Sequence, residues 1–219
     1  MEPSPSLSQL LVNTLPPGFV RVFPKKLADV YSESYQTVFN NPNLNKEDAT
    51  YLLGHKRRAL AETVFYRTAV EHGLKASHVQ PENGGCAHVS VEIGQFCLAM
   101  CHVQTRGAFP KHSDNREQAS QINRNLPQLD LFPDIFPDKK DDFFGILVHT
   151  EYPGNKDQFQ SVSIGFPNTN FNNWVDEPID LLDIQNLQEQ AFQSKSDPHI
   201  LNQNDSPTFK TKIIQKHQG

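Results

Sequence analysis

Two stretches of alternating apolar and polar residues dominate the hydropathy pattern of this chain. The first covers residues 86–103, where two alternating runs meet at a turn that begins with Gly94. Alternation with period two is typical of a strand with one buried face, and a two-residue connection that begins with glycine favours a hairpin. This hairpin pairs Ile93 with Phe96. Its expected core face consists of Val89, Val91, Ile93, Phe96, Leu98 and Met100.

The second stretch, 143–166, predicts another hairpin. Residues 143–152 are almost all apolar, which is typical of a central strand buried on both faces. Pro153 and Gly154 then indicate a turn, and the alternating residues 159–166 are expected to form the partner strand.

Helical spacing of apolar residues predicts four helices, at about 26–40, 46–72, 113–125 and 180–192. Asn45 is a suitable N-cap for the second of them, because its side chain can accept a hydrogen bond from a free amide of the first turn. The apolar face expected for that helix consists of Leu52, Leu53, Ala59, Leu60, Thr63, Val64 and Val70. A short strand is expected at 19–23, ended by Pro24.

Strands separated by helices indicate an α+β fold. We expect a single domain over 19–193, in which the two hairpins form a mixed or antiparallel sheet and the helices pack mainly against one face. Residues 1–18 hold four prolines and several serines, so a flexible segment is expected there. Residues 194–219 are polar and locally basic, so we expect a disordered tail.

Composition and charge narrow the classes of protein. The 219 residues are 37% apolar and carry a net charge of −5. No run approaches the roughly 18 apolar residues that a transmembrane helix needs. The negative charge argues against general electrostatic binding to nucleic acid, while a local basic patch stays open. Three cysteines and no recognisable secretion signal favour a cytoplasmic protein that does not bind membranes.

The polar face of the first hairpin is one candidate for chemistry. Its register places Glu92 opposite Cys97 and His88 opposite Cys101, and thiolate, imidazole and carboxylate groups all bind zinc. These four residues are a candidate metal site. The alternative is a half-buried sheet face covered by a helix, in which both cysteines act as packing residues. We expect no cofactor, with a divalent ion (Zn²⁺ or Mg²⁺) as the alternative.

A pair of acids is the second candidate. The order helix, hairpin, helix, strand between about residues 60 and 150 resembles the core of restriction-endonuclease-like folds. The resemblance implies that Glu62 on a helix and Glu92 on a strand bind a metal ion that cleaves phosphodiesters. Those folds also place an acid-x-lysine motif on the next strand, whereas residues 101–104 here contain neither an acid nor a lysine. The alternative is that both glutamates are ordinary surface acids.

His149 and Glu151 form a third candidate, at the end of the apolar stretch 143–152. Their spacing places both side chains on one face of a strand, and a histidine–carboxylate pair can transfer protons in catalysis. The alternative is a histidine that is hydrogen-bonded at the edge of the sheet.

Two predicted helices carry polar residues suited to partners. A basic group on the second helix can grip phosphate or form a solvated face, and it comprises Lys56, Arg57, Arg58 and Arg67. The helix at 113–125 is mostly polar, so it lies at the surface or serves a polar site. We expect it to contact a partner through Arg116, Gln118 and Asn123.

No motif in the chain identifies an activity, since it has neither a phosphate-binding glycine loop nor a G-x-S-x-G nucleophile elbow. We therefore expect a soluble, non-enzymatic regulatory protein that binds another protein, such as an antitoxin, immunity or anti-phage accessory component. The rival hypothesis is an enzyme that acts on nucleic acid, or a degenerate restriction-endonuclease-like protein. Nucleic acid would then bind through the C-terminal tail or the basic helix.

Overall fold

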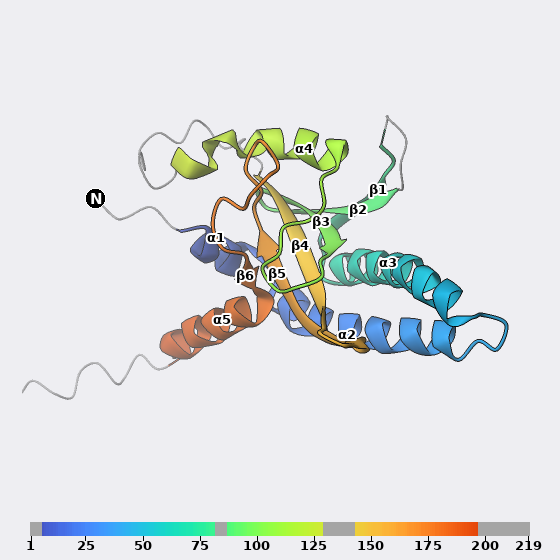
Figure 1. Cartoon of the computed structure of the whole chain (residues 1–219). Helices are drawn as coiled ribbons and strands as arrows, with labels where there is room; N and C mark the ends of the chain where they lie inside the picture. The colour runs from blue at the N-terminus through green and yellow to red at the C-terminus, as the bar shows by residue number, and fades with distance from the viewer. Residues whose placement is uncertain (1–5, 82–86, 129–142, 197–219) are drawn as a thin grey trace, which may run out of the picture.

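The alternating stretches of the sequence become strands of one six-stranded mixed sheet (Figure 1). The structure is a computed structural model, and it describes residues 6–81, 87–128 and 143–196. Within these ranges, five α-helices accompany the sheet. The predicted α+β fold class is therefore confirmed.

The strands follow one another across the sheet in their order along the chain. Neighbours are antiparallel except β3 and β4, which are parallel because the chain crosses between them through a helix. The short edge strands β1 and β6 are not indicated by the sequence pattern. The strands are β1 (Lys75–Val79), β2 (His88–Ile93), β3 (Phe96–His102), β4 (Phe143–Tyr152), β5 (Asn155–Gly165) and β6 (Ile179–Asp180).

Both predicted hairpins are present. β2 and β3 pair Ile93 with Phe96 across a turn in which Gly94 has φ +59°, a left-handed conformation that glycine adopts without strain. β4 and β5 are antiparallel and are connected through Gly154. β4 is buried along almost its whole length, as its apolar run predicts.

The predicted register of the first hairpin holds near its turn and is wrong further from it. Pairing of β2 with β3 covers three residue pairs, of which Val91 with Leu98 is furthest from the turn. The expected pair of His88 with Cys101 is not part of this register, and His88 instead pairs with Val79 of β1. Residues 88–90 of β2 therefore pair with β1 alone, and residues 99–102 of β3 pair with β4 alone.

Helices cover both faces of the sheet, whereas the sequence suggests mainly one. α2 and α3 lie on one face, α5 packs beside α2, and α1 packs against α5 (Figure 1). α4 and a 3-10 helix, η1, lie on the other face. The helices are α1 (Leu7–Thr14), α2 (Pro17–Phe39), α3 (Lys46–Glu71), α4 (Asp114–Ser120), η1 (Gln121–Gln128) and α5 (Leu181–Ser196).

Two apolar cores result from this layering. Alternate residues of a strand point to opposite faces of the sheet. Phe143 and Leu147 of β4 therefore join the core under α2 and α3, while Phe144 and Ile146 join the core under α4. The sheet is buried on both sides along β4, which explains why that strand has no polar alternation.

The predicted strand at 19–23 is wrong, because these residues lie inside α2 together with Pro24. Phe19 and Phe23 lie one helical turn apart, are fully buried and stack with their ring centroids 5.2 Å apart. A stretch of five residues is too short to distinguish a strand from a helix whose buried face continues to Val38.

The expectation that residues 1–18 are flexible is also wrong for most of this segment, since it contains α1. Leu11 and Leu15 are buried in the main core. Gln188 of α5 donates hydrogen bonds to the carbonyls of Val12 and Leu15 at 2.9 and 2.8 Å. Apolar contacts and backbone hydrogen bonds thus fix α1 to the domain.

α3 presents a different buried stripe from the one expected. It begins at the Asn45 cap, whose side chain accepts a hydrogen bond from the Asp48 amide at 2.8 Å. Leu52 and Val70 are 42% and 50% exposed, so they are not on the buried face. The observed stripe includes Arg57, which is 4% exposed and is therefore not part of a solvated basic face. Its first members are Ala49, Leu53, Arg57, Ala61 and Phe65.

The other predicted helices are present with shifted bounds. The helix predicted at 26–40 is α2, which begins earlier, and the helix predicted at 113–125 is α4 followed by η1. The helix predicted at 180–192 is α5, and residues 197–219 of the predicted tail lie outside the described residues. In the part of the chain that the structure describes, no helix is both long and apolar enough to cross a membrane.

Candidate functional site

A cavity of about 530 Å³ opens between α3, α4 and one end of the sheet. The carboxyl-terminal residues of the two parallel strands line it, namely Cys101 and His102 of β3 and His149 and Glu151 of β4. In open sheets with parallel strands, ligands commonly bind outside the carboxyl ends of the strands. This cavity is therefore the candidate functional site.

The cavity lies where β2 and β3 separate. We call the opening between residues 88–90 of β2 and 99–101 of β3 the strand fork. Hydrogen-bonding groups alternate in direction along an antiparallel strand, so the Val89 amide points to the same side as Ile93, toward β3. It donates instead to Glu62 Oε2 of α3 at 2.7 Å. The Glu62 carboxylate thus takes the place of a partner strand at the fork.

Two arginines reach the cavity from helices on opposite faces of the sheet, Arg58 from α3 and Arg116 from α4 (Figure 1). We call this pair the arginine clamp. Arg58 donates to the Ala87 carbonyl at 3.0 Å, and Arg116 contacts the Lys111 carbonyl at 3.4 Å and the Cys101 thiol. Because a guanidinium has five N–H donors, the clamp keeps donors that no described residue satisfies.

The groups around the clamp are largely uncharged. Burial lowers the pKa of His88, and the two clamp arginines lower it further. Burial also raises the pKa of the Cys101 thiol, although the clamp arginines oppose this shift. Glu62 is the carboxylate beside the clamp, and burial raises its pKa while a backbone hydrogen bond and the arginines lower it. The positive charge of the clamp is therefore only partly compensated.

A second group of polar residues consists of three that line the same cavity, Arg57, His149 and Glu151, and of Tyr31, which is buried behind them. We call this group the closed network. The Arg57 guanidinium hydrogen bonds to the Glu151 carboxylate and the Lys156 carbonyl, and it lies over the Tyr31 ring, 4.1 Å from the centroid. The Tyr31 hydroxyl and His149 Nδ1 are 2.7 Å apart. These contacts join α2, α3, β4 and β5.

Burial sets the protonation of the closed network. It holds the pKa of His149 well below the ordinary value, and the neighbouring His102 and Arg57 lower it further. It also raises the pKa of Tyr31, so this hydrogen bond joins a neutral phenol to a neutral imidazole. The pKa of His102 is lowered mainly by burial, although Glu151, 3.9 Å from its Nε2, acts in the opposite direction.

The cavity is electropositive although the chain is acidic overall. Four cationic side chains and two carboxylates line the cavity, whereas the whole chain carries a net charge of −5. Glu151 neutralises Arg57 within the closed network. Much of the uncompensated positive charge therefore lies at the clamp, where the low-dielectric walls of a cleft strengthen its attraction for anions.

The cavity brings together several residues that the sequence singles out. Glu92 is not among them: its carboxylate pairs with Lys75 at 2.7 Å and is 53% exposed. The expected acid pair of Glu62 and Glu92 is therefore not assembled in one site. The predicted residues that line the cavity are Arg57, Arg58, Glu62, His88, Cys101, Arg116, His149 and Glu151.

The predicted metal-binding set is also divided. His88 and Cys101 line the cavity, whereas Cys97 is not part of its lining and lies 3.1 Å from the Ser90 hydroxyl. Among the described residues, His88, Glu92, Cys97 and Cys101 do not form a group whose ligand atoms lie within 4.8 Å of one another. The separation of β2 from β3 is the physical reason, because it breaks the predicted pair of His88 with Cys101.

The three predicted partner-binding residues have different surroundings. Arg116 belongs to the clamp, and Gln118 is exposed on α4. Asn123 is 1% exposed, and its side-chain amide bonds to the backbone N–H and carbonyl of Phe144 and to the Pro167 carbonyl, each at 2.8 Å. The prediction that Asn123 contacts a partner is wrong, because its amide joins η1 to the sheet.

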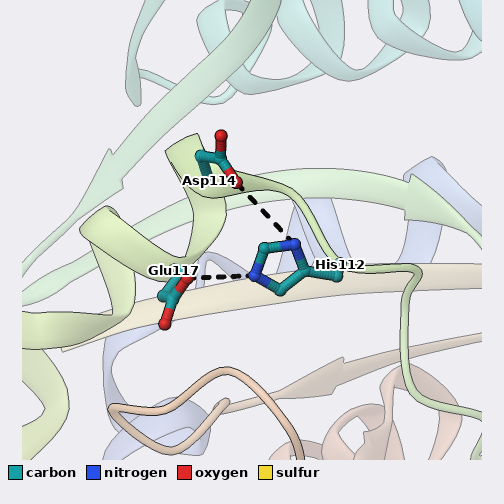
Figure 2. Close-up of side chains that lie close together, drawn as sticks. All are labelled: His112, Asp114 and Glu117. Carbon is teal, nitrogen blue, oxygen red and sulfur yellow. Dashed lines mark hydrogen bonds and ion pairs between the residues drawn. The ribbon is translucent and has the colours of Figure 1, made fainter.

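A separate cluster of a histidine and two acids lies at the start of α4 (Figure 2). His112 Nε2 is 2.9 Å from Glu117 Oε2, and its Nδ1 is 3.8 Å from Asp114 Oδ1. Within the described ranges, these side chains form the one group of such residues whose potential ligand atoms lie within 4.8 Å of one another. Each carboxylate faces a different ring nitrogen and the side chains are 43–90% exposed, so we interpret the cluster as surface ion pairs.

Sequence reasoning missed three contributors to the site: Tyr31, His102 and the burial of Arg57. Tyr31 falls on the apolar stripe of its helix and is indistinguishable there from a core residue. A signal for Arg57 did exist, because it stands four residues from both Leu53 and Ala61. That spacing places it on their face of the helix.

Comparisons with known proteins do not identify a relative: no protein-family model, curated protein or solved structure matches this chain. The resemblance to restriction-endonuclease-like folds therefore rests on the order of elements expected from the sequence alone, and the structure adds β1 between α3 and the β2–β3 hairpin. Because one fold can host many functions, the function has to be argued from the site.

Proposed function

We propose that this protein is a non-enzymatic binding protein whose cavity receives an anionic ligand. The observation that carries this proposal is the arginine clamp, in which Arg58 and Arg116 reach one cavity from opposite layers of the fold. Guanidinium groups bind carboxylate and phosphate oxygens through paired, charge-assisted hydrogen bonds. The clamp combines positive charge with donors that no residue within the described ranges uses, and an anion-binding site requires both properties.

The carboxylates of the cavity support binding rather than metal-dependent catalysis. Glu62 accepts a hydrogen bond from the Val89 amide, and Glu151 pairs with the buried Arg57. Cleavage of phosphodiesters by divalent ions needs hard carboxylate ligands held together around the metal. Here each carboxylate has a structural partner, and Glu92 lies outside the cavity.

A regulatory role through a protein partner fits this proposal. The cavity opens beside α3 and α4, where Tyr51 is 74% exposed and Gln118 is also exposed. A partner that contacts these helices would respond to whether the cavity is occupied. The classes expected from the sequence (antitoxin, immunity and anti-phage accessory proteins) all act by binding a partner, so they belong to this proposal.

Calorimetric titration of the full chain with inorganic phosphate, pyrophosphate and citrate tests the clamp. We expect at least one of these anions to bind. We expect the double variant Arg58→Gln/Arg116→Gln to lose at least roughly tenfold in affinity, because hydrogen bonds to charged groups contribute about 1.5–3 kcal/mol each. Arg67→Gln is the matched control, since Arg67 is exposed on the same helix and outside the cavity. The proposal is wrong if no anion binds, or if control and clamp variants lose affinity equally.

The rival hypothesis of an enzyme acting on nucleic acid has its own test. The wild-type protein is incubated with DNA and with RNA in the presence of Mg²⁺ or Mn²⁺, beside Glu62→Gln. A binding protein leaves both substrates intact. Cleavage that Glu62→Gln abolishes would overturn the non-enzymatic proposal and place Glu62 in a catalytic site.

A further inference from the structure

We infer that the anionic ligand is a nucleoside monophosphate, with its phosphate in the arginine clamp and its base beside His102. This inference rests on the proposed function, because it needs the clamp to hold the phosphate. It adds the chemical class of the whole ligand, which the clamp alone does not define.

The size of the cavity argues for a ligand larger than an inorganic anion. Its volume of about 530 Å³ lies within the range of roughly 300–1,000 Å³ that is typical of sites for small organic molecules. A phosphate ion held by Arg58 and Arg116 would leave most of that space unfilled. The ligand therefore needs an organic body attached to its anionic group.

The walls of the cavity favour a body with flat apolar faces. Leu53 of α3, Met100 of β3, Ala119 of α4 and Phe144 of β4 all line it. A sugar phosphate has little apolar surface to cover these side chains. The ribose of a nucleotide can instead hydrogen bond to Thr50, Ser113 and Asn115, which also line the cavity. An aromatic heterocycle is compatible with such walls, because only its edge needs hydrogen-bonding partners.

The histidines of the cavity provide partners for such an edge. Cys101 and His102 are consecutive residues of β3. Cys101 lies beside the clamp and His102 lies beside the closed network, so this strand connects the two groups. The side chain of His102 is 38% exposed, and its ring centroid lies 5.4 Å from that of His149. A neutral imidazole offers one donor and one acceptor, which matches the mixed donor and acceptor edge of a nucleobase. A ligand whose body is an alkyl chain would leave the donor and the acceptor of this imidazole without hydrogen-bond partners.

Titration of the full chain separates this inference from the proposed function. AMP, GMP, CMP and UMP are compared with inorganic phosphate, ribose 5-phosphate and adenosine. We expect at least one nucleotide to bind tenfold or more tightly than phosphate, ribose 5-phosphate or adenosine. If inorganic phosphate or ribose 5-phosphate binds as tightly as every nucleotide, the inference is wrong while the proposed function stands. If nothing binds, both are wrong.

Variants of His102 supply the second arm of the test. We expect His102→Ala to weaken nucleotide binding by about tenfold and to leave phosphate binding unchanged, whereas Arg58→Gln weakens both. His55→Ala is the control, because His55 is exposed on α3 and does not line the cavity. His102→Gln, which keeps a donor and an acceptor, should recover part of the affinity. Nucleotide binding that is unaffected by His102→Ala would overturn the placement of the base.

Discussion

Arg57 and Arg58 are neighbours on α3 and line the same cavity, yet their surroundings differ. Arg57 is 4% exposed and hydrogen bonds to Glu151 and to the Lys156 carbonyl in the closed network. Arg58 is exposed, belongs to the arginine clamp and bonds to one backbone carbonyl, that of Ala87. The comparison teaches that charge alone does not mark a binding residue. Arg57 also has a buried Nε without a hydrogen-bond partner, so what distinguishes Arg58 is its exposure and the lack of a carboxylate ion pair among the described residues.

The largest expected effect is on the free energy of unfolding of the protein when the closed network is disrupted. Arg57→Met keeps the bulk of the side chain and removes its charge, leaving the Glu151 carboxylate, which is 22% exposed, without its partner. Because removal of one member of a buried ion pair costs about 3–5 kcal/mol, we expect a loss of about 3 kcal/mol in the free energy of unfolding, measured with urea.

Arg58→Met is the matched control for that measurement. Surface substitutions usually change stability by less than about 0.5 kcal/mol, so we expect a change within that limit. Equal losses in the two variants would contradict the distinction between a closed network and a clamp. If only Arg57→Met loses stability, the distinction between the closed network and the clamp is supported.

The second prediction concerns pH. Because the pKa of His149 is well below its ordinary value of 6.5 in the folded protein, the unfolded chain takes up a proton more readily. Stability from neutral His149 is therefore complete above about pH 6.5 and decreases as the pH falls below it, by at most about 1.4 kcal/mol per pH unit for one proton.

Urea unfolding of wild type and His149→Asn between pH 7 and pH 5 measures this contribution. Asparagine keeps a hydrogen-bond acceptor near the position of Nδ1 but does not titrate, so Tyr31 retains a partner. We expect the variant to lose less stability than wild type over this range. The same loss in both proteins would show that His149 is not held neutral by the fold.

The smallest expected effect is at the clamp. Glu62→Gln keeps an acceptor for the Val89 amide and removes the negative charge beside Arg58 and Arg116. We expect phosphate affinity to rise by about threefold, because the ligand no longer meets a carboxylate there. Titration calorimetry measures the change, with the exposed Glu92→Gln as control. A fall in affinity would mean that Glu62 itself holds the ligand, through a proton or a metal ion.

Local patterns in the sequence were enough to predict the two hairpins and most of the helices. The apolar run of β4 and the turn at Gly94 depend on residues within a few positions of each other, so they can be predicted without the rest of the fold. The N-terminal strand at 19–23 was predicted wrongly for the same reason: over five residues, the two periods give similar patterns. The register of β2 with β3 was correct only close to its turn.

The candidate site was predicted as scattered residues rather than as an arrangement. Glu62, His88, Cys101, His149 and Glu151 were identified by residue type, and all of them line the cavity. His149 and Glu151 lie together in the cavity, as their spacing predicts. The pairs of Glu62 with Glu92 and of His88 with Cys101 are not observed, and the second relied on a hairpin that is paired along its whole length. The strand fork forms through the bond between Glu62 and the Val89 amide, which lie 27 residues apart.

The sequence by itself therefore determined the elements of this protein: the alternating strands, the apolar helix faces, the acidic total charge and the residue types available for chemistry. Tertiary structure decided which of two adjacent arginines is buried and which is exposed. The contact that buries Arg57 joins residues 94 positions apart, and the clamp joins helices from opposite faces of the sheet. Local periodicity reports only neighbours along the chain, so it contains no information about such contacts.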